Sequence, residues 1–418
     1  MSPATKTLLL LETRMTGHRP SYLRRITQMA LRNGMQVLIA MPKDCLEHPV
    51  AQTLLNTDNK TNNRTTVNAI HCQREVDNTQ SSNISGMLRR ERQCAAFYKE
   101  ALYNANKIRP VDIIIIGTFD DAGLSSGLRL PAFGDTPWLG IVMKQRFHFS
   151  AADAIGPPGS KLLLLKRWLF VRLLKQLKPQ SQILTIDESL HHFMASNYPA
   201  VKNRIAYIPD PVDDRREVTR PEVRIELAIP KEAFVILAYG SLRKRKGVES
   251  LLDVLHELPD NIHALLVGTQ TPDIKACVNS EKHSPLLAAG RVHQMNRYID
   301  VSEDPNFFSP ADAIWLAYQD YFAMSAVMVQ AAQYRRPAIA SKNGLVGFLT
   351  NKYQTGLLVD TTDKSQLHVA ITKLMNNDFC PTEEHYDAFS SAFSLAAFEG
   401  ILLDSIEHVC SASPTRQQ

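Results

Sequence analysis

The sequence predicts an α/β protein with two domains, each built around a parallel sheet of the Rossmann type. Three observations support this prediction: the chain has 418 residues, short apolar runs alternate with helical stripes, and polar or basic loops follow the apolar runs. A chain of this length is too long for one ordinary hydrophobic core. Buried apolar runs that alternate with amphipathic helices are typical of parallel sheets covered by helices on both faces.

Composition and charge describe a soluble globular protein, with 44% hydrophobic and 21% charged residues. We expect no membrane-spanning helix, because apolar runs stay below the roughly 18 residues that spanning needs. The run Leu8–Leu11 is too short for a signal peptide, so we expect a cytoplasmic protein. The six cysteines are scattered and form no C-x-x-C pair, which favours reduced thiols over a disulfide or zinc framework. The net charge of +5 allows an acidic ligand or an anionic membrane, and we expect no nucleic acid partner.

The first predicted unit of strand, helix and strand spans Thr7–Glu12, Ser21–Asn33 and Met35–Ala40. Its first loop holds Gly17 and His18-Arg19 but no G-x-G-x-x-G sequence, which argues against a dinucleotide site. Gly17 permits close approach of the backbone, and the two basic residues could contact an acceptor or a phosphate. A solvated turn remains the alternative interpretation of this loop.

Two further predicted strands lead to residues that could carry chemistry. The strand Val111–Gly117 leads to Asp120, and the strand Trp138–Met143 leads to His148. Because the carboxyl ends of parallel strands meet at one edge of a sheet, both residues are expected on the side of Gly17. A neutral histidine there could act as a base or orient a hydroxyl group. A buried structural histidine remains the alternative for His148.

Residues Lys161–Lys178 predict an amphipathic helix with basic but no acidic side chains. At about 100° per residue, one face is apolar and contains Leu162, Leu165, Leu169, Phe170, Leu173 and Leu177. The basic residues cluster opposite, and Trp168 interrupts them. Two interpretations remain open: the helix lies on an anionic bilayer, at the inner membrane face, or it packs on the sheet with a solvated basic edge.

A proline-rich segment at Pro209–Asp213 predicts the boundary between the domains. We therefore expect an N-terminal domain over residues 1–212, a second domain over 213–390, and a C-terminal helix and tail over 391–418. In the second domain the strand Ala233–Gly240 leads to a basic loop and then a helix. Arg243 and Arg245-Lys246 lie in this loop, which predicts a phosphate site, with a solvated charge run as the alternative.

A second phosphate-binding element is predicted between Ala311 and Gly344. A buried strand at Ala313–Ala317 precedes a polar loop and then a helix for which Ser325 is a suitable cap. The helix start, Ser325-Ala326, therefore lies beyond the carboxyl end of a parallel strand. Ligands bind there in open α/β sheets, and the free N–H groups of the helix favour phosphate.

Three segments in this half match the ordered motifs of one enzyme family. They are Gly240-Ser241-Leu242 with Lys246-Gly247, Ala311-Asp312, and Arg336-Pro337-Ala338-Ile339-Ala340-Ser341 with Gly344. The chain thereby resembles GT-B-fold glycosyltransferases of the retaining family 4, the glycosyl transferases group 1. The resemblance covers residues 235–375 well and residues 7–215 more weakly. It implies two Rossmann-like domains facing a cleft, with a C-terminal helix that crosses back onto the first domain.

The resemblance also implies roles for residues at the donor side. Lys246 corresponds to the family's diphosphate-binding lysine, which Arg243, Arg245, Ser325 and Ala326 would assist. The loop with Gly268 and the strand with His293 would line the pocket of the nucleotide base. The family's two glutamates fall on Phe322 and Gln330, and Gln330 can still hydrogen-bond a ribose whereas Phe322 cannot replace a carboxylate.

Asp320 could stand in for the first family glutamate, which lies near the transferred sugar, and His18, Asp120 and His148 would face the acceptor. The resemblance implies transfer of a sugar from a UDP- or GDP-sugar to a glycan or lipid-linked acceptor in polysaccharide biosynthesis. It implies retention of the anomeric configuration, no metal and no cofactor. The loss of both glutamates keeps a second hypothesis open, a non-catalytic binding or scaffold protein with this fold. A nucleotide-sugar epimerase is a third.

Overall fold

The computed structural model describes residues 5–56, 66–74, 76, 84–122, 130–149, 156, 160–211 and 220–413. The chain divides into two compact units. The first takes its described residues from Met1–His148, Gly159–Ile208 and Glu399–Gln418, and the second takes most of its residues from Pro209–Phe398. The predicted boundary between residues 212 and 213 lies outside the described residues.

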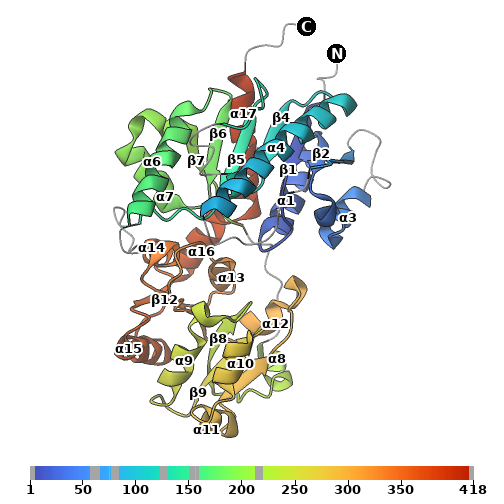
Figure 1. Cartoon of the computed structure of the whole chain (residues 1–418). Coiled ribbons are helices and arrows are strands. Elements are labelled where there is room, and N and C mark those ends of the chain that lie inside the picture. The colour runs from blue at the N-terminus through green and yellow to red at the C-terminus, as the bar shows by residue number, and fades with distance from the viewer. Residues whose placement is uncertain are drawn as a thin grey trace. The chain divides into compact units, whose positions relative to one another are not determined.

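The described part of the first unit contains a parallel sheet with the strand order β3-β2-β1-β4-β5-β6-β7 (Figure 1). The strands are β1 (Thr7–Leu11), β2 (Gln36–Ala40), β3 (Val67–Ile70), β4 (Ile113–Ile116), β5 (Trp138–Val142), β6 (Ser181–Thr185) and β7 (Ile205–Tyr207). The helices are α1 (Arg19–Arg32), α2 (Lys43–Leu46), α3 (Pro49–Asn56), α4 (Ile84–Ile108), η2 (Phe119–Ala122), α6 (Lys161–Gln176), α7 (Glu188–Asn197) and η3 (Pro199–Arg204). The order reverses between β1 and β4, and this is the point where such sheets bind ligands.

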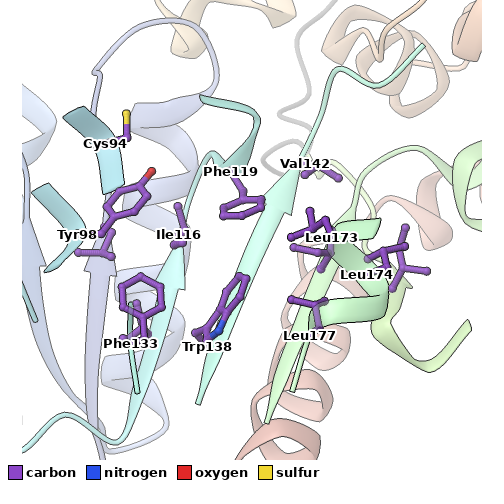
Figure 2. Packing of buried hydrophobic residues seen from close by; sticks show 14 of the residues in the cluster. Cys94, Tyr98, Ile116, Phe119, Phe133, Trp138, Val142, Leu173, Leu174 and Leu177 are labelled. Carbon is purple, nitrogen blue, oxygen red and sulfur yellow. The ribbon is translucent and has the colours of Figure 1, made fainter. Parts of the chain in front are cut away.

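An aromatic cluster fills the core beside β4 and β5, as Figure 2 shows. The Trp138 ring lies 5.5 Å from the Phe119 ring and 5.8 Å from the Phe133 ring, between centroids. Helix α4 contributes Cys94 and Tyr98, both fully buried. Burial of such large apolar side chains stabilises the sheet and holds the ends of its strands in fixed positions.

Helix α6 is confirmed, and burial of its predicted apolar face changes along its length. Leu169 and the later apolar residues are buried, whereas Leu162 and Leu165 are 47% and 50% exposed. Trp168 is also exposed. The fully buried residues of α6 lie in its second half, and Leu163 packs against the core from the first half. Periodicity alone could not separate the buried leucines from the exposed ones.

The C-terminal helix α17 (Leu395–Ser411) joins the first unit from Glu399 onward, so the predicted return of this helix is confirmed. Its Glu399 carboxylate pairs with Arg32 of α1. Together with α16 (Glu383–Ala392) it forms, within the described ranges, one helical stretch long and apolar enough to cross a membrane by length and composition. The core helices of soluble proteins pass the same test, so the expectation of no membrane-spanning helix stays a prediction. Phe398 and Leu402 of α17 are fully buried, which accounts for part of its apolar character.

The described part of the second unit contains a parallel sheet with the order β10-β9-β8-β11-β12-β13. The strands are β8 (Phe234–Tyr239), β9 (Ile262–Val267), β10 (Val292–Met295), β11 (Ala313–Leu316), β12 (Ala338–Ser341) and β13 (Gly356–Val359). The helices before β11 are α8 (Arg220–Glu226), η4 (Lys244–Lys246), α9 (Val248–Leu255), α10 (Pro272–Val278), α11 (Ser284–Ala288), η5 (Val301–Glu303) and α12 (Pro305–Phe308). After β11 come α13 (Ala326–Gln333), α14 (Gly344–Tyr353), α15 (Lys364–Met375) and α16. This order is that of the first sheet without its last strand, and it reverses between β8 and β11.

Candidate functional site

The loop after β8 carries a buried lysine at the reversal point of the second sheet. Gly240 ends the strand segment, and the one-turn helix η4 brings Lys246 back to the strand ends. Gly247 has a φ of +67°, and a Cβ atom there would lie only 2.6 Å from the carbonyl oxygen of Ala317. This glycine therefore lets the loop after β8 pass close to the end of β11.

The ammonium group of Lys246 points into the unit rather than into solvent. The residue is 6% exposed, and its Nζ donates a hydrogen bond of 2.6 Å to the Tyr318 hydroxyl. Burial, assisted by the charge of Arg245, lowers the pKa of Lys246 to about 7. Among the described residues no carboxylate pairs with this ammonium. A cation held in this way gains stability from any anion that reaches it.

The loop after β11 supplies the other wall. Tyr318 follows the strand directly, and its hydroxyl lies 3.3 Å from Ser325 Oγ. Ser325 occupies the N-cap position of α13, but its side chain accepts no hydrogen bond from the backbone amides of the first turn. Those amides, including the one of Ala326, are therefore not capped by this serine. The indole of Trp315 also donates to the Lys246 carbonyl at 2.9 Å, which fixes the lysine backbone.

The two predicted arginines are exposed at the same loop. Arg245 lies over the Tyr321 ring, 4.4 Å from its centroid, and its carbonyl accepts a bond of 2.8 Å from the Gln319 amide. Arg243 Nε donates to Ser241 Oγ at 3.1 Å. The structure thus brings the basic loop together with the start of α13, as an anion site requires.

The two positions of the missing glutamates differ in their surroundings. Phe322 is 7% exposed, with its ring 6.0 Å from that of Phe149, so an apolar group occupies the first position. Asp320, two residues earlier, is exposed at a φ of +48°. Gln330 on α13 donates through Nε2 to a carboxylate oxygen of Asp304.

Gly268 and His293 do not come together in the structure. Gly268 follows β9 at the ligand edge, where its φ of +116° lets it pass against the Gly240 carbonyl. His293 lies two residues before the end of β10, with its Nε2 3.1 Å from Nδ1 of His263. His263 is the second residue of β9, so this pair lies toward the amino ends of the strands.

The candidate residues of the first unit lie in well-bonded loops. His18 and Gly17 are exposed before α1, while Arg19 is buried and donates to Glu12 Oε1 at 3.0 Å. Glu12 Oε2 also accepts from the Thr118 hydroxyl at 3.1 Å, which links the ends of β1 and β4. The cation at this reversal point is therefore neutralised within the unit.

Asp120 and His148 hold the ends of strands together. The Asp120 carboxylate accepts from the amides of Met143 and Lys144, at 2.7 and 3.2 Å, and so orders the chain after β5. His148 is fully buried, with Nε2 3.0 Å from an oxygen of Asp187 and 3.0 Å from Ser189 Oγ. Through these contacts, both residues stabilise the loops that follow the strands of the first unit.

Three residues of the site escaped the sequence analysis: Trp315, Tyr318 and Asp304. Tyr318 could have been found as a polar aromatic residue directly after a buried strand, whereas Asp304 carries no local signal. Within the described ranges no cluster of three His, Cys, Asp or Glu side chains is placed to hold a metal ion. Chemically, the edge between β8 and β11 can bind an anionic group through Lys246, the arginines and helix amides.

Residues 219–392 match the family model described as glycosyl transferases group 1. Solved structures with this fold include sucrose-phosphate synthase from Thermosynechococcus elongatus, with a TM-score of 0.69, 16% identity, and coverage of 98% of this chain and 100% of that chain. Anabaena Alr3699/HepE in complex with UDP has a TM-score of 0.65, 18% identity, and coverage of 96% and 100%. The glycosyltransferase WaaG, involved in lipopolysaccharide biosynthesis, has a TM-score of 0.60, 15% identity, and coverage of 96% and 99%. The search of curated proteins found no match.

Proposed function

We propose that this chain, whose residues 219–392 match the glycosyl transferases group 1 model and whose fold is that of solved GT-B glycosyltransferases, transfers a sugar from a UDP-sugar to a glycan or lipid-linked acceptor. The observation that carries this proposal is the buried Lys246, which has no carboxylate partner in the described part of its unit. A GDP-sugar is the second donor to test. Anabaena HepE is described in complex with UDP and with UDP-glucose, which favours the uridine nucleotide.

The diphosphate of the donor would lie against Lys246, Arg243, Arg245 and the amides of α13. In the reaction the bond between the sugar and the diphosphate breaks, and negative charge grows on the leaving phosphate oxygen. Fixed positive groups stabilise such charge without reorganisation. We propose that these residues supply that stabilisation without a metal, and that no cofactor takes part.

We propose retention of the anomeric configuration, with the leaving phosphate accepting the proton of the acceptor hydroxyl. Among the catalytic candidates, Asp320 near the transferred sugar and His18 on the acceptor side are exposed, so both are accessible to a substrate. Asp120 and His148 would act by holding their loops in place. The first unit would receive the acceptor.

The amino end of α6 gives the proposed protein a surface for an anionic membrane. Leu164 and Trp168 are 55% and 53% exposed, and Lys161, Lys166 and Arg167 lie on the same turns. Exposed apolar side chains beside basic ones favour the headgroup region of anionic bilayers. We therefore propose a cytoplasmic enzyme that contacts the inner membrane face, where a lipid-linked acceptor in polysaccharide biosynthesis would be available.

Co-sedimentation with vesicles of phosphatidylglycerol tests this surface. Leu164→Ser/Trp168→Ser should reduce the fraction of protein bound to the vesicles several-fold relative to the parent protein. Vesicles of neutral lipid should bind neither the parent protein nor the variant. Val369→Ser, which changes a 50% exposed apolar residue of α15, is the matched control. Equal binding of all three proteins would refute the membrane proposal and leave the donor proposal standing.

The alternative is a non-catalytic protein that binds a nucleotide-sugar. It is favoured by one observation, the apolar and buried Phe322 at a carboxylate position of the family. A thermal-shift panel of UDP, GDP, ADP, CMP and their sugars, with Lys246→Ala as control, tests the donor site. A shift that the variant loses supports the site. Sugar transfer or donor hydrolysis then separates the enzyme from the binding protein, and no shift with any nucleotide would refute the donor assignment.

A further inference from the structure

Asp304 is a buried carboxylate that the proposed reaction does not use. It stands directly before α12 and is 5% exposed. One of its oxygens accepts from the hydroxyl of Tyr239, the last residue of β8, and the other accepts from Nε2 of Gln330 on α13. Asp304 therefore links the end of β8 to α13, the helix that follows β11.

The contact with Asp304 determines which end of the Gln330 amide is available. A glutamine side chain has an NH₂ donor end and a carbonyl acceptor end, whereas an ionised carboxylate only accepts. The NH₂ end must therefore face Asp304, and the carbonyl oxygen Oε1 remains. Gln330 is partly exposed, and the described residues provide no donor to this oxygen. Gln330 thus offers a hydrogen-bond acceptor, as one oxygen of a carboxylate would.

The position of Gln330 suits the sugar of a nucleotide. It is the fifth residue of α13, one helical turn beyond Ala326. A diphosphate held by Lys246 and the first amides of α13 would leave the adjoining ribose within reach of this second turn. The hydroxyl groups of a ribose are donors that an acceptor oxygen can recognise.

We propose that Asp304 is a positioning residue for the ribose of the donor, because it orients the Gln330 amide so that Oε1 accepts a hydrogen bond from a ribose hydroxyl. The inference rests on the proposed nucleotide-sugar function. In this chain the carboxylate lies at residue 304 and the acceptor oxygen at residue 330, so that the two together perform what one glutamate could perform.

Calorimetric titration with UDP, GDP and their 2′,3′-dideoxy analogues measures the contribution of the ribose hydroxyls. The parent protein should bind its ribonucleotide about tenfold more tightly than the dideoxy analogue, as one satisfied hydrogen bond provides. Asp304→Asn should lose this preference, because an asparagine can pair with either end of the Gln330 amide. Affinity for the dideoxy analogue should not change. Asp363→Asn, the same substitution at the partly exposed cap of α15, is the matched control.

Exchange of the two side chains distinguishes positioning from a general structural role. Gln330→Glu alone sets two carboxylates against each other and should weaken binding of the ribonucleotide. Asp304→Asn/Gln330→Glu restores one amide and one carboxylate, and the preference for ribose should return. This double variant also carries the test if Asp304→Asn alone does not fold.

Three results would overturn the inference while leaving the donor site in place: no preference for ribose in the parent protein, an unchanged preference in Asp304→Asn, or no recovery in the exchanged pair. Failure of the parent protein to bind UDP or GDP at all is a different result. It would refute the proposed function, and the inference with it.

Discussion

The two units build the same sheet reversal and place opposite chemistry there. In the second unit the ends of β8 and β11 meet around Lys246, whose partner is a neutral tyrosine hydroxyl. In the first unit the ends of β1 and β4 meet around Glu12, which pairs with Arg19 and Thr118. The strand order favours a ligand at both points, but the charges differ. Within the described residues, the second reversal point presents a buried cation beside a neutral hydroxyl, whereas the buried Arg19 at the first is paired with Glu12. The fold alone therefore does not locate the donor site.

The largest expected effect lies in the first unit and concerns stability. Arg19→Met should lower the free energy of unfolding by about 3–5 kcal/mol, because it leaves the buried Glu12 carboxylate without its cation. Chemical denaturation measures this loss. Glu12→Gln/Arg19→Met removes both charges and should recover most of it. UDP affinity of each folded variant should stay within twofold, and a large change in affinity would contradict the division of work between the two points.

Matched glycine substitutions sharpen the comparison. Gly247 and Gly17 have φ angles of +67° and +66°, but only at Gly247 would a Cβ atom meet a neighbour, at 2.6 Å. Gly247→Ala should therefore cost about 2–4 kcal/mol from backbone strain and overpacking together. Gly17→Ala should cost only the backbone part, about 1–2 kcal/mol. Equal losses in denaturation experiments would show that the loop after β8 does not lie as closely against β11 as described.

Removal of the buried cation should act on binding rather than on folding. Lys246→Met should weaken UDP binding by about 100-fold, since charged hydrogen bonds contribute about 1.5–3 kcal/mol each. The stability of the ligand-free protein should rise or stay constant. The substitution removes an ammonium group whose burial costs free energy, and methionine is apolar. Calorimetry and denaturation of the same variant test both statements. A strong loss of stability with normal UDP binding would assign Lys246 to the core.

The alternation of strands and helices could be predicted well from the sequence. The same is true of those site residues that lie close together in the chain, such as the basic loop after β8. Lys246 was recognisable because a basic loop flanked by glycines follows a buried strand. Its partner Tyr318 lies 72 residues away, and that pairing exists only because β8 and β11 are neighbours in the sheet. The hydrogen bond between Asp304 and Gln330 likewise exists only because the start of α12 lies beside α13. The sequence left the role of His148 undecided between a base and a structural residue. A lone histidine after a strand does not reveal its contact with Asp187, which lies many residues later in the chain.

The pH dependence of binding tests whether Lys246 is held near neutrality. The pKa of Lys246 in the folded protein, about 7, lies below the ordinary lysine value of 10.5, so the unfolded chain binds the proton more strongly than the native one. Stability from this group is complete at high pH and is lost as pH falls from about 10.5 toward 7. A bound diphosphate favours the ammonium, so UDP affinity should fall about tenfold between pH 7.0 and 8.5. Binding near pH 8 should take up close to one proton, which calorimetry in buffers of different ionisation enthalpy detects. Lys246→Met should abolish the uptake.

The smallest expected effect concerns the hydroxyl groups at the two reversal points. Tyr318→Phe removes the acceptor of the Lys246 ammonium and keeps the ring, whose centroid lies 4.1 Å from Nζ. We expect UDP affinity to fall about fivefold, because the lysine loses the hydrogen bond that orients its ammonium group. Thr118→Val removes the corresponding hydroxyl beside Glu12 and should cost about 1 kcal/mol of stability without a change in UDP affinity. If both substitutions lowered only stability, the hydroxyl at residue 318 would be a core group like its counterpart. If only Tyr318→Phe weakened UDP binding, the two reversal points would differ in function down to a single oxygen atom.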